Sequence, residues 1–140
     1  MARGYCSITK VYSFSAGHRL YMKNASDEEN LRIFGKCTNP RGHGHDYYLE
    51  VTVKGDIDPE TGMITDLSKL NNLVNGVIEG LDHKRLDIEV PFFQDFTPSG
   101  ENILKYLWVK IKPLIQNGVL HHLKLWETRN NYFEFFEEDI

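Results

Sequence analysis

Four segments of the chain alternate between apolar and polar residues, as half-buried β-strands do. In the first segment serine and threonine occupy one parity, and the other parity is apolar except for Lys10. A turn at residues 129–131 separates the last two segments. Each segment is expected to bury one face. The predicted strands are residues 6–16, 43–54, 119–127 and 132–136.

Two further segments carry apolar residues at the three- and four-residue spacing of an amphipathic helix. The first covers residues 66–81 and starts at Asp66, a suitable N-cap; the second starts at Ser99, another suitable N-cap, and Pro113 should kink or end it. Residues 19–44 lack a clear period and are predicted to form a long, functional loop with room for one short helical turn. The order ββααββ predicts an α+β fold, with two helices covering an antiparallel sheet.

Composition and charge restrict the class of protein. The 140 residues suit a single domain covering residues 1–140, and a hydrophobic fraction of 41% is enough for a substantial core. A net charge of −4 makes nucleic acid a poor partner, because its binding normally needs a basic face. No stretch is long and apolar enough to span a membrane, and the N-terminus lacks the apolar run of a secretory signal. Together with the two cysteines, Cys6 and Cys37, these features predict a cytoplasmic protein.

Three histidines form the strongest chemical signal. His43 and His45 are two residues apart in a predicted strand, so their imidazoles point to the same face. His18 continues the apolar parity of the first strand and can supply a third nitrogen if the two strands pair. Three protein ligands with an open fourth position are typical of catalytic Zn²⁺, although imidazole also suits Cu, Ni and Fe. The alternative is that these are ordinary polar residues at a strand end, as we expect for His121 and His122 on the surface.

Several short motifs follow one another along the chain, from about Phe14 to Asn131. They are Phe14-Ser15-Ala16-Gly17-His18-Arg19-Leu20-Tyr21, Phe34-Gly35-Lys36-Cys37, Asn39-Pro40-Arg41-Gly42-His43-Gly44-His45, Leu81-Asp82-His83-Lys84, Glu101-Asn102-Ile103 and Glu127-Thr128. No single motif is specific, but jointly and in this order they resemble the 6-pyruvoyl-tetrahydropterin synthase family.

The resemblance implies a tunnelling fold. In this fold each chain contributes a four-stranded antiparallel sheet with two helices on one face. Three chains join their sheets into a 12-stranded barrel, two trimers stack as a homohexamer, and the active sites lie at subunit interfaces. Joining the sheets removes edge strands that would otherwise remain open.

The resemblance also implies a reaction, the conversion of 7,8-dihydroneopterin triphosphate to 6-pyruvoyl-tetrahydropterin plus triphosphate. This is a phosphate-eliminating lyase step of tetrahydrobiopterin biosynthesis. It combines loss of triphosphate with an internal redox shift from side chain to ring, so no external oxidant is needed. The expected cofactor is Zn²⁺ on His18, His43 and His45, where a Lewis acid would stabilise developing negative charge on oxygen. A base must then lie beside the metal.

Cys37 is the candidate base and matches the catalytic cysteine of the family. It lies six residues before His43 in the predicted functional loop. A metal ion together with Lys36 and Arg41 would favour its thiolate form. The residue type alone leaves two alternatives open, namely a fourth zinc ligand or an inert buried thiol.

The position of Cys37 also bears on competing functions. A related enzyme, 6-carboxy-tetrahydropterin synthase, usually has its cysteine four residues before the first histidine of its His-Gly-His motif, and here the interval is six. An aldolase-like relative uses glutamate in place of the cysteine. Outside the enzymes, the same scaffold could be a non-catalytic pterin- or metal-binding module.

The remaining site residues follow from the resemblance. Asp82 and His83 match a proton-relay pair, in which a carboxylate orients an imidazole. Glu127 matches a carboxylate with a catalytic role that anchors the pterin ring, and Glu101 matches a second pterin contact. Ser99 keeps a hydroxyl where the family often has the first of two threonines. As isolated features, these residues also fit ordinary surface positions.

One departure from the family pattern lies at the start of the second predicted helix. Where the family often has a second threonine, this chain has Gly100, which has no hydroxyl to offer a pterin. Basic residues in or beside the long loop are candidates for binding the triphosphate. They are Arg19, Lys23, Lys36 and Arg41.

Overall fold

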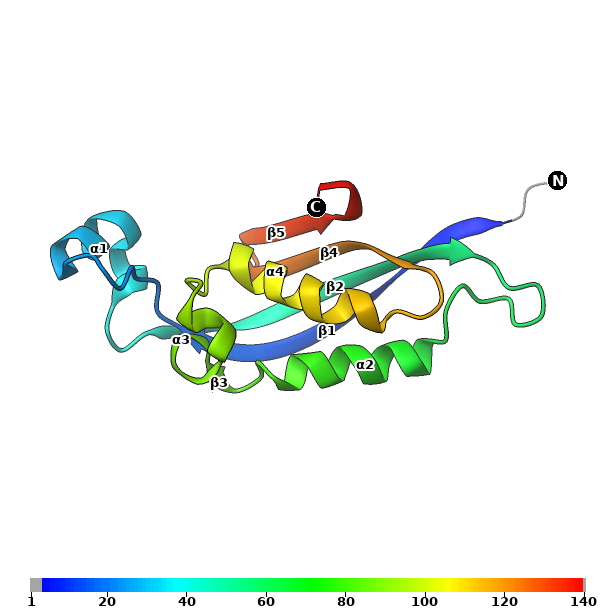
Figure 1. Ribbon diagram of the computed structural model, residues 1–140, viewed down its shortest axis with the longest axis horizontal. Coiled ribbons are helices and arrows are strands. Elements are labelled where there is room, and N and C mark those ends of the chain that lie inside the picture. The colour runs from blue at the N-terminus through cyan, green and yellow to red at the C-terminus, as the bar shows by residue number, and fades with distance from the viewer. Residues whose placement is uncertain (1–3, 140) are drawn as a thin grey trace.

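The computed structural model describes residues 4–139 and shows an α+β fold built on one sheet (Figure 1). The strands are β1 (Tyr5–His18), β2 (His43–Asp56), β3 (Lys84–Arg85), β4 (Val119–Thr128) and β5 (Asn131–Phe136). They lie in the order β3-β1-β2-β4-β5, and the four long strands are antiparallel neighbours, as predicted. The prediction of a four-stranded, purely antiparallel sheet was incomplete, because the two-residue β3 pairs parallel with β1.

Two long helices, α2 (Leu67–Glu79) and α4 (Gly100–Ile111), lie on the same side of the sheet (Figure 1). The side chains of Asp66 and Ser99 accept hydrogen bonds from backbone N–H groups in the first turns, so both predicted N-caps are confirmed. Pro113 lies just beyond α4 in a short 3-10 helix, which agrees with its predicted effect.

The core lies between the two helices and the inward face of the sheet. Alternation along β2 buries Tyr47, Leu49, Val51 and Val53 completely, and the apolar stripes of α2 and α4 pack against them. Removing each such side chain from water stabilises the fold by roughly 1.5–3 kcal/mol. The largest fully buried side chains are Tyr47, Leu49, Leu70, Leu81, Leu86, Ile103, Leu104, Leu107, Ile111, Leu120, Leu123 and Leu125.

The pairing of β1 with β2 is the longest ladder of the sheet. It runs without a break from Tyr5 opposite Asp56 to His18 opposite His43. Because a one-residue slip would move every core side chain to the opposite face, the burial of this ladder fixes its register. The register therefore brings the end of β1 and the start of β2 together, where the three histidines lie.

The predicted loop at residues 19–44 contains more structure than the sequence indicated. It forms α1 (Asp27–Phe34) and a 3-10 helix, η1 (Gly35–Thr38), which lie at one end of the sheet (Figure 1). Ser26 caps α1 through its side chain. The sequence indicated only one short helical turn because this helix has no apolar stripe. Its buried residue is Asn30, whose amide bonds both the N–H and the C=O of Met22.

Two short helical segments connect α2 to α4. They are α3 (Leu86–Glu89) and the 3-10 helix η2 (Pro91–Gln94). With β3, they occupy the same end of the sheet as the histidines, beside the edge of β1 (Figure 1). Within residues 4–139, no helix is long and apolar enough to cross a lipid bilayer.

His121 and His122, which were expected on the surface, are half-buried and have side-chain partners. Both lie in β4, and their side chains are only 21% and 16% exposed. His122 Nε2 is 3.1 Å from Glu134 Oε1, and its ring stacks on Phe136. The cross-strand pairing of β4 with β5 supplies these neighbours, and the sequence pattern of β4 alone could not reveal them.

Candidate metal centre

The three predicted metal ligands meet at one end of the sheet. His18 ends β1 and lies directly opposite His43, the first residue of β2, while His45 follows on the same face of β2. One donor nitrogen from each ring lies within 4.8 Å of the other two. The paired strands therefore bring the three imidazoles together as the parity of the sequence predicted.

The hydrogen bonding of these rings suits a metal ion. His18 Nδ1 is 2.7 Å from the carbonyl oxygen of Pro98, so Nδ1 carries the proton and Nε2 presents a lone pair. That Nε2 lies 3.0 Å from His43 Nε2, and the buried Nε2 of His45 has no hydrogen-bond partner among the described residues. A cation accepting all three lone pairs would satisfy these atoms, and neutral imidazole is the form that binds metal.

Burial keeps two of these rings in that neutral form. Desolvation lowers the pKa of His18, which is almost completely buried, although its hydrogen bond to Pro98 opposes this effect. Desolvation also lowers the pKa of His43, and the neighbouring His45 adds to the shift. Both effects favour the unprotonated ligand at neutral pH.

Glu127 lies beside the centre. From β4, its Oε1 is 4.0 Å from His45 Nε2, and it accepts a hydrogen bond of 3.2 Å from the side-chain amide of Asn131. Its side chain is only 17% exposed. Burial, followed by the charge of Glu127, raises the pKa of Tyr47, whose ring packs edge-to-face against His45. A carboxylate held at the rim of a basic cluster can bind a polar ligand with N–H donors.

Asp82 and His83 form a pair immediately after α2. His83 Nδ1 is 3.0 Å from Asp82 Oδ1, which also accepts a bond of 2.9 Å from the backbone N–H of Ser15. That backbone bond and the contact with His83 hold the pKa of Asp82 below its usual value. His83 has a φ of 58°, unusual for a residue other than glycine, and its side chain is 81% exposed.

A pocket of about 420 Å³ lies between His83 and the end of the sheet. His83 and His45 both line it, together with Ser15, Gly17, Gly44 and Arg85 among others. The parallel pairing of β3 with β1 fixes this arrangement, because it holds the segment after His83 against Ala16 and Gly17.

Cys37 lies in η1 and is half-buried. Its carbonyl accepts a hydrogen bond of 2.9 Å from the N–H of Leu20, which ties η1 to the chain leaving β1. The group of donor atoms close enough to share one ion contains the three histidines and does not include Cys37. The arrangement thus gives no support to Cys37 as a fourth ligand.

The other predicted binding residues lie near the start of α4 and in the loop. The hydroxyl of Ser99 accepts a bond from the N–H of Asn102, and Glu101 is exposed in the first turn. Of the basic candidates, Arg19 donates to the carbonyl of Thr38 and Lys23 to that of Gln94. Lys36 and Arg41 are exposed.

Three features of this region were not predicted from the sequence. Pro98 orients His18 through its carbonyl, and Arg85 binds Asp87 beside the turn that precedes His43. Gly100 packs against the ring of Phe133, and an added Cβ would lie 2.0 Å from that ring. The contacts of Pro98 with His18, of Arg85 with the carbonyl of Arg41 and of Gly100 with Phe133 each join residues far apart in the sequence, so no local pattern reveals them.

The fold and this centre define an α+β protein with a candidate three-histidine metal site at one end of its sheet. Residues 7–138 match the family model described as 6-pyruvoyl tetrahydropterin synthase. The chain therefore belongs to the 6-pyruvoyl tetrahydropterin synthase family, and it is an enzyme of that family.

Similar proteins agree with this assignment. The chain is 48% identical over 130 residues to 6-pyruvoyl tetrahydrobiopterin synthase from Pongo abelii, covering 92% of this chain and 90% of that one. It is 47% identical over 130 residues to the Homo sapiens protein of the same name, with the same coverage. The structure of 6-pyruvoyl tetrahydropterin synthase from Caenorhabditis elegans superposes with a TM-score of 0.92 at 39% identity, covering 97% of this chain and 99% of that one.

Proposed function

We propose that this enzyme is a zinc-dependent lyase that converts 7,8-dihydroneopterin triphosphate to 6-pyruvoyl-tetrahydropterin and triphosphate in tetrahydrobiopterin biosynthesis. The observation that carries the proposal is the convergence of His18, His43 and His45 at the end of β1 and β2, with Glu127 beside them. In a member of this family, that arrangement provides a metal site next to a carboxylate that can hold a pterin.

The metal would be held by the Nε2 atoms of His18 and His43 and by His45, whose buried Nε2 has no other described partner. When bound, Zn²⁺ supplies a Lewis acid that stabilises negative charge developing on oxygen. The carbonyl of Pro98 keeps His18 in the tautomer that the metal requires. Three protein ligands leave a position open for substrate.

Proton transfer is assigned to Cys37 and His83. In this proposal the Cys37 thiolate removes a proton from a side-chain carbon of the substrate, and the His83 imidazole exchanges a proton on the opposite side. Asp82 orients His83 through their 3.0 Å contact and is itself fixed by the N–H of Ser15. The segment that carries Cys37 leads into β2 through residues 39–42, and the segment that follows His83 pairs with the end of β1.

Pterin binding is assigned to Glu127, whose carboxylate would accept hydrogen bonds from a ring N–H and the ring amino group. Glu101 and Ser99 are proposed as further pterin contacts, although Gly100 removes the second hydroxyl. The exposed side chains of Lys36 and Arg41 are better placed to meet the triphosphate than Arg19 and Lys23, which already bind backbone carbonyls.

The exposed face of the sheet supports the proposed 12-stranded barrel and homohexamer. On the face opposite the helices, Val11, Tyr48 and Tyr132 are 59%, 52% and 47% exposed. A single sheet with exposed apolar side chains and an open edge at β5 favours association with further copies. In the hexamer, active sites would lie between subunits. We also assign the activity to the cytoplasm, following the sequence features.

Product analysis tests this proposal. The purified, zinc-loaded protein is incubated with 7,8-dihydroneopterin triphosphate, and the pterin products and released triphosphate are identified by mass spectrometry. We expect 6-pyruvoyl-tetrahydropterin in equal amount to triphosphate. A carboxy-pterin accompanied by acetaldehyde would instead identify a 6-carboxy-tetrahydropterin synthase, and an absence of turnover would identify a binding module.

Two further measurements test the metal dependence and the assembly. Removing metal with a chelator should abolish turnover, and restoring Zn²⁺ should recover it. Light scattering should give a mass of six chains, and a monomer at working concentration would contradict the proposed assembly.

A further inference from the structure

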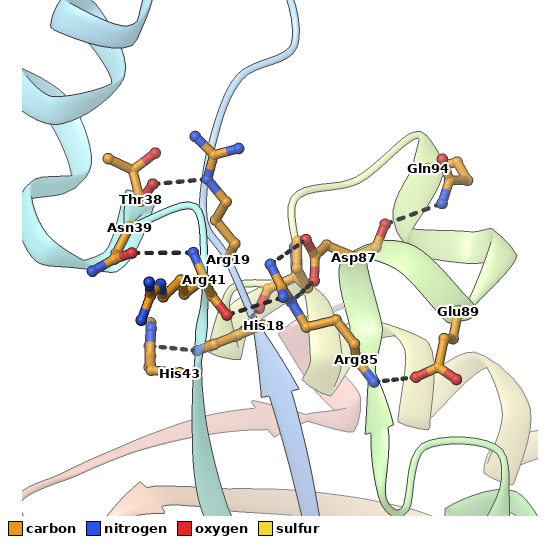
Figure 2. A network of polar contacts seen from close by, with 11 residues as sticks. His18, Arg19, Thr38, Asn39, Arg41, His43, Arg85, Asp87, Glu89 and Gln94 are labelled. Atoms are coloured by element: carbon orange, nitrogen blue, oxygen red, sulfur yellow. Dashed lines mark hydrogen bonds and ion pairs between the residues drawn. The ribbon is translucent and has the colours of Figure 1, made fainter.

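Arg85 occupies a central place beside the metal centre, although none of the proposed chemistry uses it. Its Nε and one terminal nitrogen bind the two carboxylate oxygens of Asp87 at 2.6 and 3.1 Å, and its other terminal nitrogen donates to the carbonyl of Arg41 at 3.1 Å (Figure 2). The guanidinium also lies against Gly42, where an added Cβ would be 2.7 Å from the Arg85 Cζ atom. One side chain thus contacts both residues that immediately precede His43.

The backbone of the same residue lies beside the other ligand-bearing strand. β3 pairs Arg85 with Gly17, the residue immediately before His18. An added Cβ at Gly17 would lie 3.7 Å from Cδ of Arg85 and 3.4 Å from the carbonyl oxygen of His43. Arg85 therefore touches the chain just before two of the three histidines, one through its backbone and the other through its side chain.

The position of the guanidinium is itself firmly held. The side chain of Asp87 is only 4% exposed, and the carbonyl of Asp87 accepts a bond from the side chain of Gln94. The backbone N–H of Arg85 donates to Glu89 at 2.6 Å (Figure 2). A bidentate pair between Arg and a buried carboxylate has a defined geometry, because the planar fork matches both oxygens.

The turn that Arg85 contacts joins two parts of the proposed machinery. Residues 39–42 connect η1, which carries Cys37, to β2, which begins with His43. Within the turn, the N–H of Gly42 bonds the carbonyl of Asn39 at 2.8 Å. With a φ of 72°, Gly42 adopts a conformation that side chains disfavour, and it leaves room for the guanidinium.

We infer that Arg85 is a positioning residue that holds the Cys37–His43 segment against the end of β1 and so sets the spacing of His18, His43 and Cys37. Its partner Asp87 fixes the guanidinium, and the guanidinium fixes the carbonyl of Arg41 and the Cα of Gly42. Lysine cannot fulfil this role, because one ammonium group cannot bind both Asp87 oxygens and the Arg41 carbonyl in a planar fork. The inference rests on the metal centre of the proposed function.

Metal affinity tests this inference without using turnover. Co²⁺ is titrated into the apoprotein, and its visible absorption spectrum reports the geometry of the site. The main variant is Arg85→Gln/Asp87→Asn, which removes both charges and so leaves no unpaired buried carboxylate. Arg85→Lys preserves the charge but not the fork. The matched control is Arg32→Gln, on the surface of α1, where the side chain is 75% exposed.

We expect the double variant to bind Co²⁺ about tenfold more weakly than the parent, at the lower end of the effect of outer-shell partners, with a shifted spectrum. Arg85→Lys should fall between the two, and Arg32→Gln should match the parent. In a Cys6→Ser background, iodoacetamide should label Cys37 faster in the double variant, because the segment is less tightly held. Thermal unfolding of each apoprotein shows that the variants remain folded.

Two results would overturn the inference, and they are distinguishable. If the parent binds Co²⁺ through its histidines and the folded double variant shows the same affinity and spectrum, Arg85 has no positioning role. If the parent binds no Co²⁺, the metal centre of the proposed function fails, and the role of Arg85 fails with it.

Discussion

The candidate metal-ligating histidines and the proposed proton-transfer residues are held by different kinds of structure. His18, His43 and His45 belong to two 14-residue strands whose unbroken pairing is fixed by core burial on one face. Cys37 lies in a four-residue 3-10 helix, and His83 lies in a turn with a φ of 58°. The strand-borne ligands therefore share the stability of the core. Cys37 and His83 lie in connecting segments, and their positions depend on a few contacts. Examples are the hydrogen bond from the N–H of Leu20 to the carbonyl of Cys37 and the pairing of β3 with β1.

One substitution in each group should abolish turnover, but only the loss of a candidate metal ligand should also weaken metal binding. His43→Ala removes one of three metal ligands, so we expect it to abolish turnover and weaken metal binding by more than the roughly 10- to 100-fold typical of an outer-shell change. Cys37→Ala should also abolish turnover almost completely but retain the metal. Zinc content by elemental analysis, measured beside activity, checks both. Loss of metal in Cys37→Ala would make Cys37 a ligand and the site structural.

A smaller loss of activity is expected at the relay pair. His83→Ala removes a proposed proton-transfer group, and such groups contribute about 10²- to 10⁴-fold to rates. Because His83 is 81% exposed, its removal should leave thermal stability and metal content unchanged. Turnover is measured over a range of pH. An unaltered rate and pH profile would show that His83 takes no part in proton transfer.

The features that could be predicted from the sequence are those set by local residue patterns. The clustering of the three histidines could be predicted from the sequence because a strand has a period of two, which places His43 and His45 on one face and aligns His18 with the core parity. The caps at Asp66 and Ser99 were also predictable, because capping depends on neighbouring residues. Local rules of this kind specified the four long strands and the two long helices.

Other features depend on contacts between distant segments and could not be predicted. The full length of helix α1 was not predicted because its buried residue is the polar Asn30, whose side chain bonds the backbone of Met22. Arg85 reaches a carbonyl 44 residues earlier in the chain, and its place emerges only when β3 pairs with β1. The roles of Cys37 and His83 came from family resemblance, and they remain predictions.

A moderate effect on stability is expected at the start of α4, close to the residue that binds His18. Pro98, which binds His18, lies two residues before Gly100, and Gly100 packs tightly on Phe133 of β5. Gly100→Ala should destabilise the protein by about 1–3 kcal/mol, the usual cost of overpacking. Phe133→Val should relieve the clash in a double variant, which chemical denaturation can measure.

Gly76 offers a matched control for that substitution. It lies inside α2, and an added Cβ there would meet nothing within 4 Å. Gly76→Ala should therefore stabilise the protein by roughly 0.5–1 kcal/mol, because alanine loses less conformational freedom than glycine in a helix. If Gly100→Ala stabilises the protein as Gly76→Ala does, the contact between Gly100 and Phe133 does not constrain α4.

The smallest expected effect is a pH dependence at Asp82, which connects the two groups by bonding both Ser15 of β1 and His83. The N–H of Ser15, and then His83, hold the pKa of Asp82 below its usual value. A carboxylate with a depressed pKa in the folded state stabilises the protein fully above the unfolded value and loses that contribution as pH falls through the folded value. Asp82→Asn should therefore lower stability at pH 7 but have progressively less effect as the pH falls below the ordinary pKa of an aspartate, about 3.9. Urea unfolding of both proteins at several pH values measures this difference. A difference that is constant with pH would mean that the charge of Asp82 contributes nothing to holding the turn, and that the backbone bond alone positions His83.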